Sequence, residues 1–160
     1  MNLAQANAAG PTGFADIAEH SPWVADVAFR LAPFASREAM IEAFCKAVLE
    51  AFEGPQMALL CAHPDLATKA KLTADSTNEQ KGAGLDTLTP EEFKHFTDLN
   101  NAYKAQNNFP FIFAVKGATK HQILAGFESR IHNSTEVEFQ TALQQVCKII
   151  RFRIEDRVSP

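Results

Sequence analysis

The sequence has 160 residues, of which 46% are hydrophobic and 21% charged, as in a globular protein large enough to bury an apolar core. The net charge of −4 lacks the basic field that binds nucleic acids or anionic membranes, so we expect neither partner. No stretch reaches the ~18 uninterrupted apolar residues of a membrane span.

The first half of the chain predicts a loose lead-in over 1–13 and a helical domain over 14–160. Ser21-Pro22 predicts a helix start, with serine as the N-cap and proline in the first helical position. Ser36 opens a longer helix. Its apolar positions recur at the spacing of one helical face: Met40, Ile41, Phe44, Val48 and Phe52.

The second half of the chain predicts further helices. Thr89 and Glu92 form a capping box at the start of one, and Thr135 and Glu138 form another at the start of the last helix. The apolar run 109–115 is either a strand or a buried extended segment, and periodicity does not decide between them. One such segment cannot build a sheet. We therefore predict an all-α fold, a single compact domain of roughly eight helices.

His63 is the first candidate for chemistry. It follows the apolar run 57–62, and Pro64 prevents that helix from continuing, so the imidazole should project at the edge of the core. Histidine titrates near neutral pH, as a general acid or base requires. The alternative is a histidine that only interacts with the dipole at the end of its helix.

Ser76, Glu79 and Gln80 form the second candidate group. Ser76 and Glu79 have the spacing of a capping box, in which both side chains bind backbone donors. The same helix N-terminus is also a natural site for an anion. Gln80 adds amide donors and an acceptor that suit a ureide.

The last helix carries Arg151 and Arg153 among apolar residues, so one of them could lie in partly buried surroundings and hold a carboxylate. The alternative is a solvated charge at a helix end. The five histidines show no metal-ligand spacing, and we expect no metal site.

The three cysteines, Cys45, Cys61 and Cys147, are far apart and have apolar neighbours. Such an odd, dispersed set is a poor disulfide framework, and we interpret them as buried small side chains in a reducing compartment. The N-terminus has no basic segment before an apolar core, so no secretion signal is expected. We expect a cytoplasmic protein.

Several longer strings occur in a characteristic order. They are Glu-His-Ser-Pro-Trp-Val-Ala at 19–25, Ala-His-Pro-Asp-Leu-Ala at 62–67, Leu-Thr-Ala-Asp-Ser-Thr-Asn-Glu-Gln at 72–80, Gly-Ala-Gly-Leu at 82–85, Leu-Asn-Asn-Ala-Tyr at 99–103, Phe-Pro-Phe-Ile at 109–112 and Lys-Ile-Ile-Arg-Phe-Arg at 148–153. Together they resemble the OHCU decarboxylase family, the 2-oxo-4-hydroxy-4-carboxy-5-ureidoimidazoline decarboxylases of urate degradation. The resemblance extends from about residue 14 to residue 158.

This resemblance implies an all-helical, usually homodimeric and cofactor-free enzyme that converts its small-molecule substrate into (S)-allantoin and CO2. It implies that His63 is the catalytic histidine and Glu79 its acidic partner. The residues implied to line the site are Pro64, Ser76, Gln80, Phe111, Ile112 and Arg153. Arg153 matches the family's terminal Leu-Arg-Leu pattern better than Arg151 does. The alternatives are an enzyme for a different ureide or imidazoline acid, and a helical module that binds a ureide or a pathway partner without catalysis.

Overall fold

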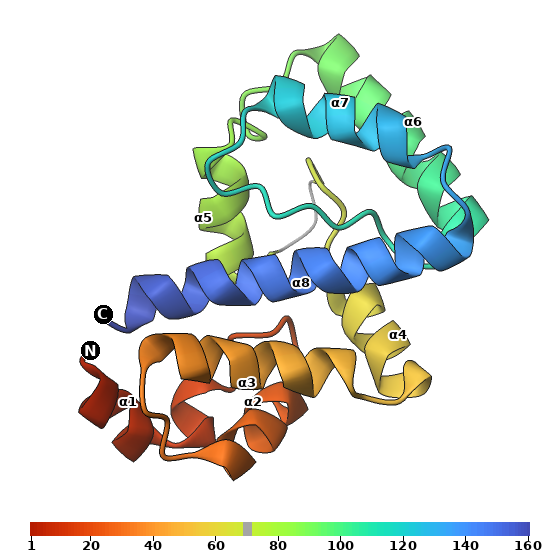
Figure 1. The fold of residues 1–160 in the computed structure, drawn as a ribbon. Coiled ribbons are helices and arrows are strands. Elements are labelled where there is room, and N and C mark those ends of the chain that lie inside the picture. Colours follow the sequence, from red (N-terminus) through yellow and green to blue (C-terminus); the bar gives the residue numbers. More distant parts are fainter. Residues whose placement is uncertain (69–71) are drawn as a thin grey trace. The chain divides into compact units, whose positions relative to one another are not determined.

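The computed structural model of the protein describes residues 1–68 and 72–160. These residues form eight α-helices and two 3-10 helices, and no strand occurs among them, which confirms the predicted all-α class (Figure 1). The chain folds as two compact units, Met1–Ala62 with Val146–Pro160 and His63–Gln145. Within the described ranges, no helix combines the length and apolar composition that crossing a bilayer requires.

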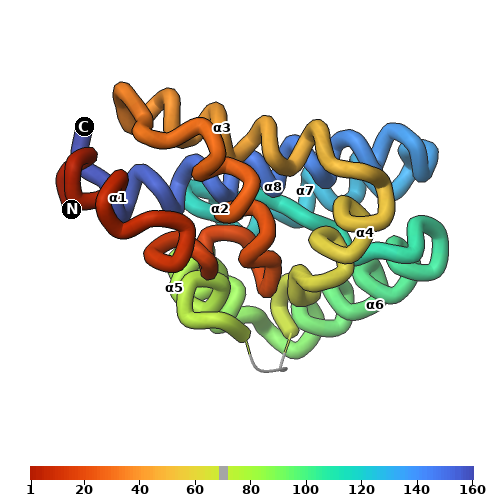
Figure 2. The backbone as a smooth tube through the Cα atoms, turned by 90° about the horizontal axis from the view of Figure 1, so that it is seen from below, coloured from red at the N-terminus to blue at the C-terminus, as the bar shows by residue number. Residues whose placement is uncertain are grey.

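The first unit is built around an aromatic core. Its elements are α1 (Leu3–Ala9), η1 (Pro11–Phe14), α2 (Trp23–Ala28), η2 (Phe29–Leu31), α3 (Arg37–Leu49), α4 (Glu53–Ala62) and the C-terminal part of α8 (Thr135–Arg157). Helix α3 lies alongside this part of α8 (Figures 1 and 2). The rings of Phe14, Phe29, Phe34 and Phe44 contact one another at centroid separations of 5.1–6.2 Å. Segment 1–13, which was expected to be a loose lead-in, contains helix α1. The predicted domain boundary at residue 14 stays a prediction.

The helix starts of this unit agree with the sequence in one case and differ in another. Ser36 caps α3 as predicted, since its side chain accepts a hydrogen bond from the backbone N–H of Ala39. The predicted N-cap at Ser21 is wrong, because α2 has Pro22 as its N-cap and the Ser21 hydroxyl donates to the Glu19 carbonyl instead.

The predicted apolar face of α3 is correct except at its end. Met40, Ile41, Phe44 and Val48 are buried, but Phe52 is 88% exposed. The helix ends at Leu49, so Phe52 lies in the turn before α4 and no longer follows the helical spacing.

The second unit surrounds the single tyrosine of the chain. It contains α5 (Ala74–Gly82), α6 (Pro90–Asn107), α7 (Lys120–Arg130) and the first part of α8, and α6 packs beside α7 (Figure 1). The predicted capping box of Thr89 and Glu92 is present at the start of α6. Segment 109–115 is extended and mostly buried without pairing as a strand. The Tyr103 ring meets the rings of Phe111 and Phe127 edge-on at 5.3 and 6.0 Å.

Candidate functional site

His63 lies immediately after α4, half-buried, at the start of a tightly held turn. The Asp65 carboxylate is 2.6 Å from the Lys104 ammonium, and the Asn100 amide donates to the Leu66 carbonyl at 2.9 Å. Two residues of α6 therefore fix the backbone that follows His63. This turn restrains the position of the imidazole more strongly than a frayed helix end would.

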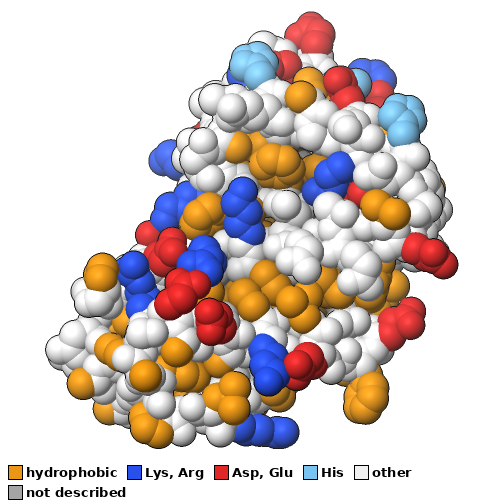
Figure 3. All heavy atoms as spheres, in the orientation of Figure 1, with side chains coloured by type: hydrophobic (Ala, Val, Ile, Leu, Met, Phe, Trp, Pro, Cys, Tyr) orange, Lys and Arg blue, Asp and Glu red, His pale blue; other side chains and the backbone are white. Residues whose placement is uncertain are grey.

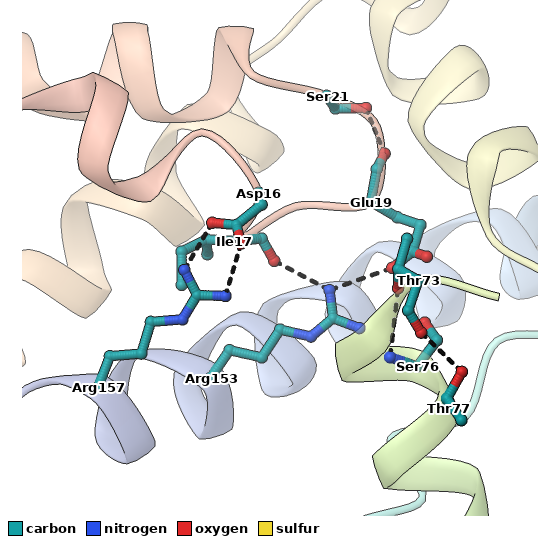
Figure 4. A network of polar contacts seen from close by, with 9 residues as sticks. All are labelled: Asp16, Ile17, Glu19, Ser21, Thr73, Ser76, Thr77, Arg153 and Arg157. Carbon is teal, nitrogen blue, oxygen red and sulfur yellow. Dashed lines mark hydrogen bonds and ion pairs between the residues drawn. The ribbon is translucent and has the colours of Figure 1, made fainter.

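Helix α5 begins one turn earlier than the predicted capping box. Thr73 is its N-cap and accepts from the backbone N–H of Ser76 at 3.2 Å (Figure 4). Thr77 donates to the Thr73 carbonyl at 2.9 Å. The capping-box interpretation of Ser76 and Glu79 is therefore wrong, because Ser76 occupies the third helical position and Glu79 lies beyond the first turn. Glu79 is half-buried, and it does not serve as a cap for the start of α5.

Gln80 connects α5 to the turn that follows His63. Its side-chain oxygen accepts from the backbone N–H of Ala67 at 3.0 Å, and its amide nitrogen lies 3.5 Å from the Asp65 carbonyl. Ala67 has a φ of +57°, a conformation that costs a non-glycine residue roughly 1–2 kcal/mol. The bond from Gln80 helps to hold this turn. It also links the backbone beside His63 to the helix that carries Glu79.

The segment with Phe111 and Ile112 is fixed by α7. The Phe111 ring stacks on Phe127 at 3.8 Å, and the Arg130 guanidinium lies 4.3 Å from the Phe111 centroid. Arg130 also donates to the Ile112 carbonyl at 2.7 Å. In the part of the chain that the structure describes, the backbone N–H groups of Ile112 and Phe113 donate no hydrogen bond. A segment held by its carbonyl can present such donors to a ligand.

The start of α8 differs from the predicted capping box. The backbone N–H of Val137 donates to the Ser134 hydroxyl at 3.3 Å, so the cap comes from Ser134 and not from Thr135. Glu138 is therefore released from the helix end and turns into the core, where it is 0% exposed.

The buried Glu138 carboxylate is held by three donors. It accepts from the Tyr103 hydroxyl at 2.6 Å, from Arg130 Nε at 2.9 Å and from the Asn133 amide at 3.0 Å. Burial, reinforced by the Glu138 carboxylate, raises the pKa of Tyr103 above its usual range. Because Arg130 binds both Glu138 and the Ile112 carbonyl, this network fixes the 111–112 segment.

Arg153 is the buried arginine of the last helix. It is 4% exposed, and its NH1 group donates at 3.1 Å to both the Glu19 carboxylate, itself 2% exposed, and the Ile17 carbonyl (Figure 4). One turn later, Arg157 pairs with Asp16 at 2.5 and 3.1 Å and lowers the pKa of that carboxyl. A buried arginine needs a partner of opposite charge, which Glu19 supplies.

Arg151 instead belongs to the surface. It pairs with Glu38 and reaches Glu155 at 3.4 Å, and its side chain is more than a third exposed. Figure 3 shows basic and acidic side chains interleaved on this part of the first unit. Of the two arginines, only Arg153 has the burial that the sequence required of a site residue. No group of three or more potential metal ligands occurs among the described residues.

The predicted site residues divide between the two units. His63, Pro64, Ser76, Glu79, Gln80, Phe111 and Ile112 belong to the second unit and Arg153 to the first. Within the second unit, Gln80 joins the turn after His63 to α5, and Arg130 fixes the 111–112 segment.

The chain as a whole has clear relatives. A family model described as OHCU decarboxylase matches residues 5–155. The chain belongs to the OHCU decarboxylase family. Two proteins named 2-oxo-4-hydroxy-4-carboxy-5-ureidoimidazoline decarboxylase are 40% identical to it over the aligned residues. The one from Halalkalicoccus jeotgali aligns over 145 residues, 91% of this chain and 82% of its own, and the one from Haloferax volcanii over 146 residues, 91% and 87%.

A solved structure supports the same family. The crystal structure of an (S)-allantoin synthase has a TM-score of 0.80 and 31% sequence identity to this chain. The match covers 99% of this chain but 54% of the synthase, so the present chain spans about half the length of that protein.

In this member of the OHCU decarboxylase family, three residues that hold predicted site residues in place were not predicted from the sequence. Arg130 was not singled out, Glu138 was interpreted as a helix cap, and Glu19 was noticed only within a longer string. Each contacts a partner that is distant in the sequence. Glu19 and Arg153 are 134 positions apart, and Arg130 and Ile112 are 18 positions apart. Local spacing carries no signal for such pairs.

Proposed function

We propose that the protein catalyses the cofactor-free decarboxylation of 2-oxo-4-hydroxy-4-carboxy-5-ureidoimidazoline to (S)-allantoin and CO2. Family membership and relatives named for this activity support the proposal. The geometric observation that carries it is the Gln80–Ala67 bond, which ties the turn after His63 to the helix bearing Glu79. An acid/base pair needs such fixed backbones on both sides.

The substrate supplies its own electron sink. When the carboxylate leaves the ring carbon as CO2, the electron pair delocalises into the adjoining C=N bond and the nitrogen of that bond takes up one proton, so the reaction needs no pyridoxal or thiamine group. The hydroxyl on the same carbon loses its proton and becomes a carbonyl. A proton is then delivered to one face of the ureido-bearing carbon, which sets the configuration of the product.

In this proposal His63 moves these protons as the general acid/base. Glu79 fixes the imidazole tautomer or accepts from the ureido N–H groups, and it lies beyond the first turn of α5. Ser76 and Gln80 complete the recognition of the ureido group. The Gln80 oxygen already accepts from Ala67, so we assign to Gln80 a positioning role as well.

The family resemblance assigns Arg153 and the 111–112 segment to binding the rest of the substrate. The Arg153 guanidinium holds an anionic or carbonyl oxygen, and its burial against Glu19 supports a fixed orientation. The N–H groups of Ile112 and Phe113 donate to ring oxygens, and Phe111 and Pro64 contribute contact surface. We also propose, from the family resemblance, that the enzyme acts in the cytoplasm as a homodimer.

A coupled assay tests the proposal. Urate oxidase and hydroxyisourate hydrolase generate the short-lived substrate in place, and circular dichroism follows the optically active product. The wild-type protein should form (S)-allantoin well above the spontaneous, racemic background. A purified, folded protein that leaves the product racemic would overturn the proposed activity.

A further inference from the structure

Two of the three cysteines lie against each other in the first unit. Cys45 is on α3 and Cys147 on α8, and 102 positions separate them in the sequence. The Cys45 thiol donates to the Cys147 carbonyl at 3.7 Å, and the Cys147 thiol donates to the Cys45 carbonyl at 3.9 Å. Each sulfur therefore lies beside the backbone of the other residue. The sequence pattern, which suggested three unrelated buried thiols, gave no sign of this pair.

The helices that carry the pair are held in an antiparallel register. Arg37 NH1 donates to the Val158 carbonyl at 3.0 Å, and Arg151 NH1 donates to the Glu38 carboxylate at 2.8 Å. Residue numbers rise along α3 from Arg37 through Glu38 to Cys45, while those of their partners fall from Val158, just after α8, through Arg151 to Cys147. These contacts lie on the N-terminal side of Cys45 and the C-terminal side of Cys147, so they restrain the distance between the thiols. Figures 1 and 2 both show α3 and α8 side by side.

The two thiols have different environments. Cys147 is 8% exposed, whereas Cys45 is half-buried and open to a small reagent. The adjacent Cys147 thiol lowers the pKa of Cys45 more than burial raises it, and the charge of Arg151 adds to the lowering. The same contact with Cys45, together with burial, raises the pKa of Cys147. This asymmetry suits Cys45 to react first and Cys147 to react second.

We propose that Cys45 and Cys147 form a reactive dithiol that hydrogen peroxide oxidises to an intramolecular disulfide. The Cys45 sulfur attacks one peroxide oxygen and the O–O bond breaks, which gives a sulfenic acid and one water. The Cys147 sulfur then attacks the Cys45 sulfur. The S–S bond forms, the S–O bond breaks, and the departing hydroxide takes the Cys147 proton as a second water. Two thiols are oxidised and one peroxide is reduced.

The exposed Cys61 provides a built-in comparison, because its thiol is accessible to alkylating reagents. The experiment uses the full chain with Cys61→Ser, so that only the proposed pair remains. After treatment with equimolar peroxide, the protein is denatured, alkylated with N-ethylmaleimide and weighed as the intact chain. We expect a loss of about 2 Da and no alkylation. Dithiothreitol should restore two alkylatable thiols.

Further variants make the result specific. The disulfide would close a loop of 102 positions and should raise the Tm by roughly 5–15 °C, a shift that dithiothreitol reverses. In Cys45→Ser and in Cys147→Ser the monomer mass loss should disappear. Two alkylated thiols after oxidation, or a sulfinic acid on Cys45 with Cys147 still alkylatable, would overturn the proposal. This chemistry is independent of the proposed decarboxylation.

Discussion

Removal of the Arg130 guanidinium perturbs the anchor of the 111–112 segment. In Arg130→Met the aliphatic stem is retained, but the bonds to Glu138 and to the Ile112 carbonyl are lost, and so is the contact with the Phe111 ring. Glu138 would keep only Tyr103 and Asn133 as donors in a fully buried position.

The expected loss of stability follows from that burial. Breaking a buried ion pair by removing one partner costs about 3–5 kcal/mol, because the remaining charge is uncompensated. The lost Ile112 bond is part of the same change, so we expect Arg130→Met to lower the free energy of unfolding by about 4 kcal/mol. In a chain of this length that corresponds to a fall in Tm of roughly 10 °C. Adding Glu138→Gln removes the stranded charge and should recover about 2 kcal/mol.

Urea unfolding followed by circular dichroism measures these free energies for the wild type, both single variants and the double variant. Arg130→Lys is the matched control, since it keeps a charge near Glu138 but cannot bridge to Ile112. If the segment also binds substrate, Arg130→Lys should raise KM. It should lower the free energy of unfolding less than Arg130→Met does. A loss below about 1 kcal/mol in Arg130→Met, or no recovery in the double variant, would refute this role for the ion pair.

The remaining predictions concern α5 and the tyrosine. Thr73→Ala should cost about 1 kcal/mol with activity largely kept, because it removes the helix cap, whereas Glu79→Gln should leave stability within about 0.5 kcal/mol and lower kcat by at least ~10²-fold. Gln80→Leu should lower kcat together with stability, since it releases the turn after His63 from α5. Tyr103 is the only tyrosine of the sequence. Its phenolate absorbance should therefore appear at a higher pH in the folded protein than in the protein unfolded in urea. Since the pKa of Tyr103 is raised in the folded protein, its protonated hydroxyl contributes fully to the free energy of unfolding below about pH 10. That contribution declines as the pH rises further.

Each of these has a decisive contrary outcome. Equal losses of stability in Thr73→Ala and Glu79→Gln would restore the capping interpretation of Glu79. A Gln80→Leu variant with unchanged kinetics would remove the positioning role. For Tyr103, identical titration of folded and unfolded protein would contradict its burial against Glu138, and Tyr103→Phe supplies the baseline.

The fold class and several helix starts could be predicted because their causes are local. Ser36 and Thr89 cap their helices where the sequence indicates, since a cap depends on residues three positions apart. The same locality explains the errors. Ser76–Glu79 fits the capping-box pattern, but Thr73 lies one turn earlier and begins the helix first. At α8, Glu138 leaves the helix end because Arg130 and Tyr103 offer it a buried site that spacing cannot reveal.

The candidate site shows the same division. His63 beside Pro64 was identified from its own neighbours, because a proline after an apolar helix marks a helix end. Spacing alone could not decide between Arg151 and Arg153, since their surroundings in the sequence are nearly the same, and only the family resemblance favoured Arg153. Arg153 meets Glu19 and Arg151 meets Glu38, both more than a hundred residues away. No pattern within one helix encodes these partners.

The most direct test of the central claim is the kcat of His63→Asn in the coupled dichroism assay. Asparagine keeps the size and polarity of the side chain but cannot transfer a proton at neutral pH. We predict a decrease of about 10²–10⁴-fold with an unchanged melting temperature. Near-normal formation of (S)-allantoin by the purified, folded variant would contradict the role of His63 as general acid/base.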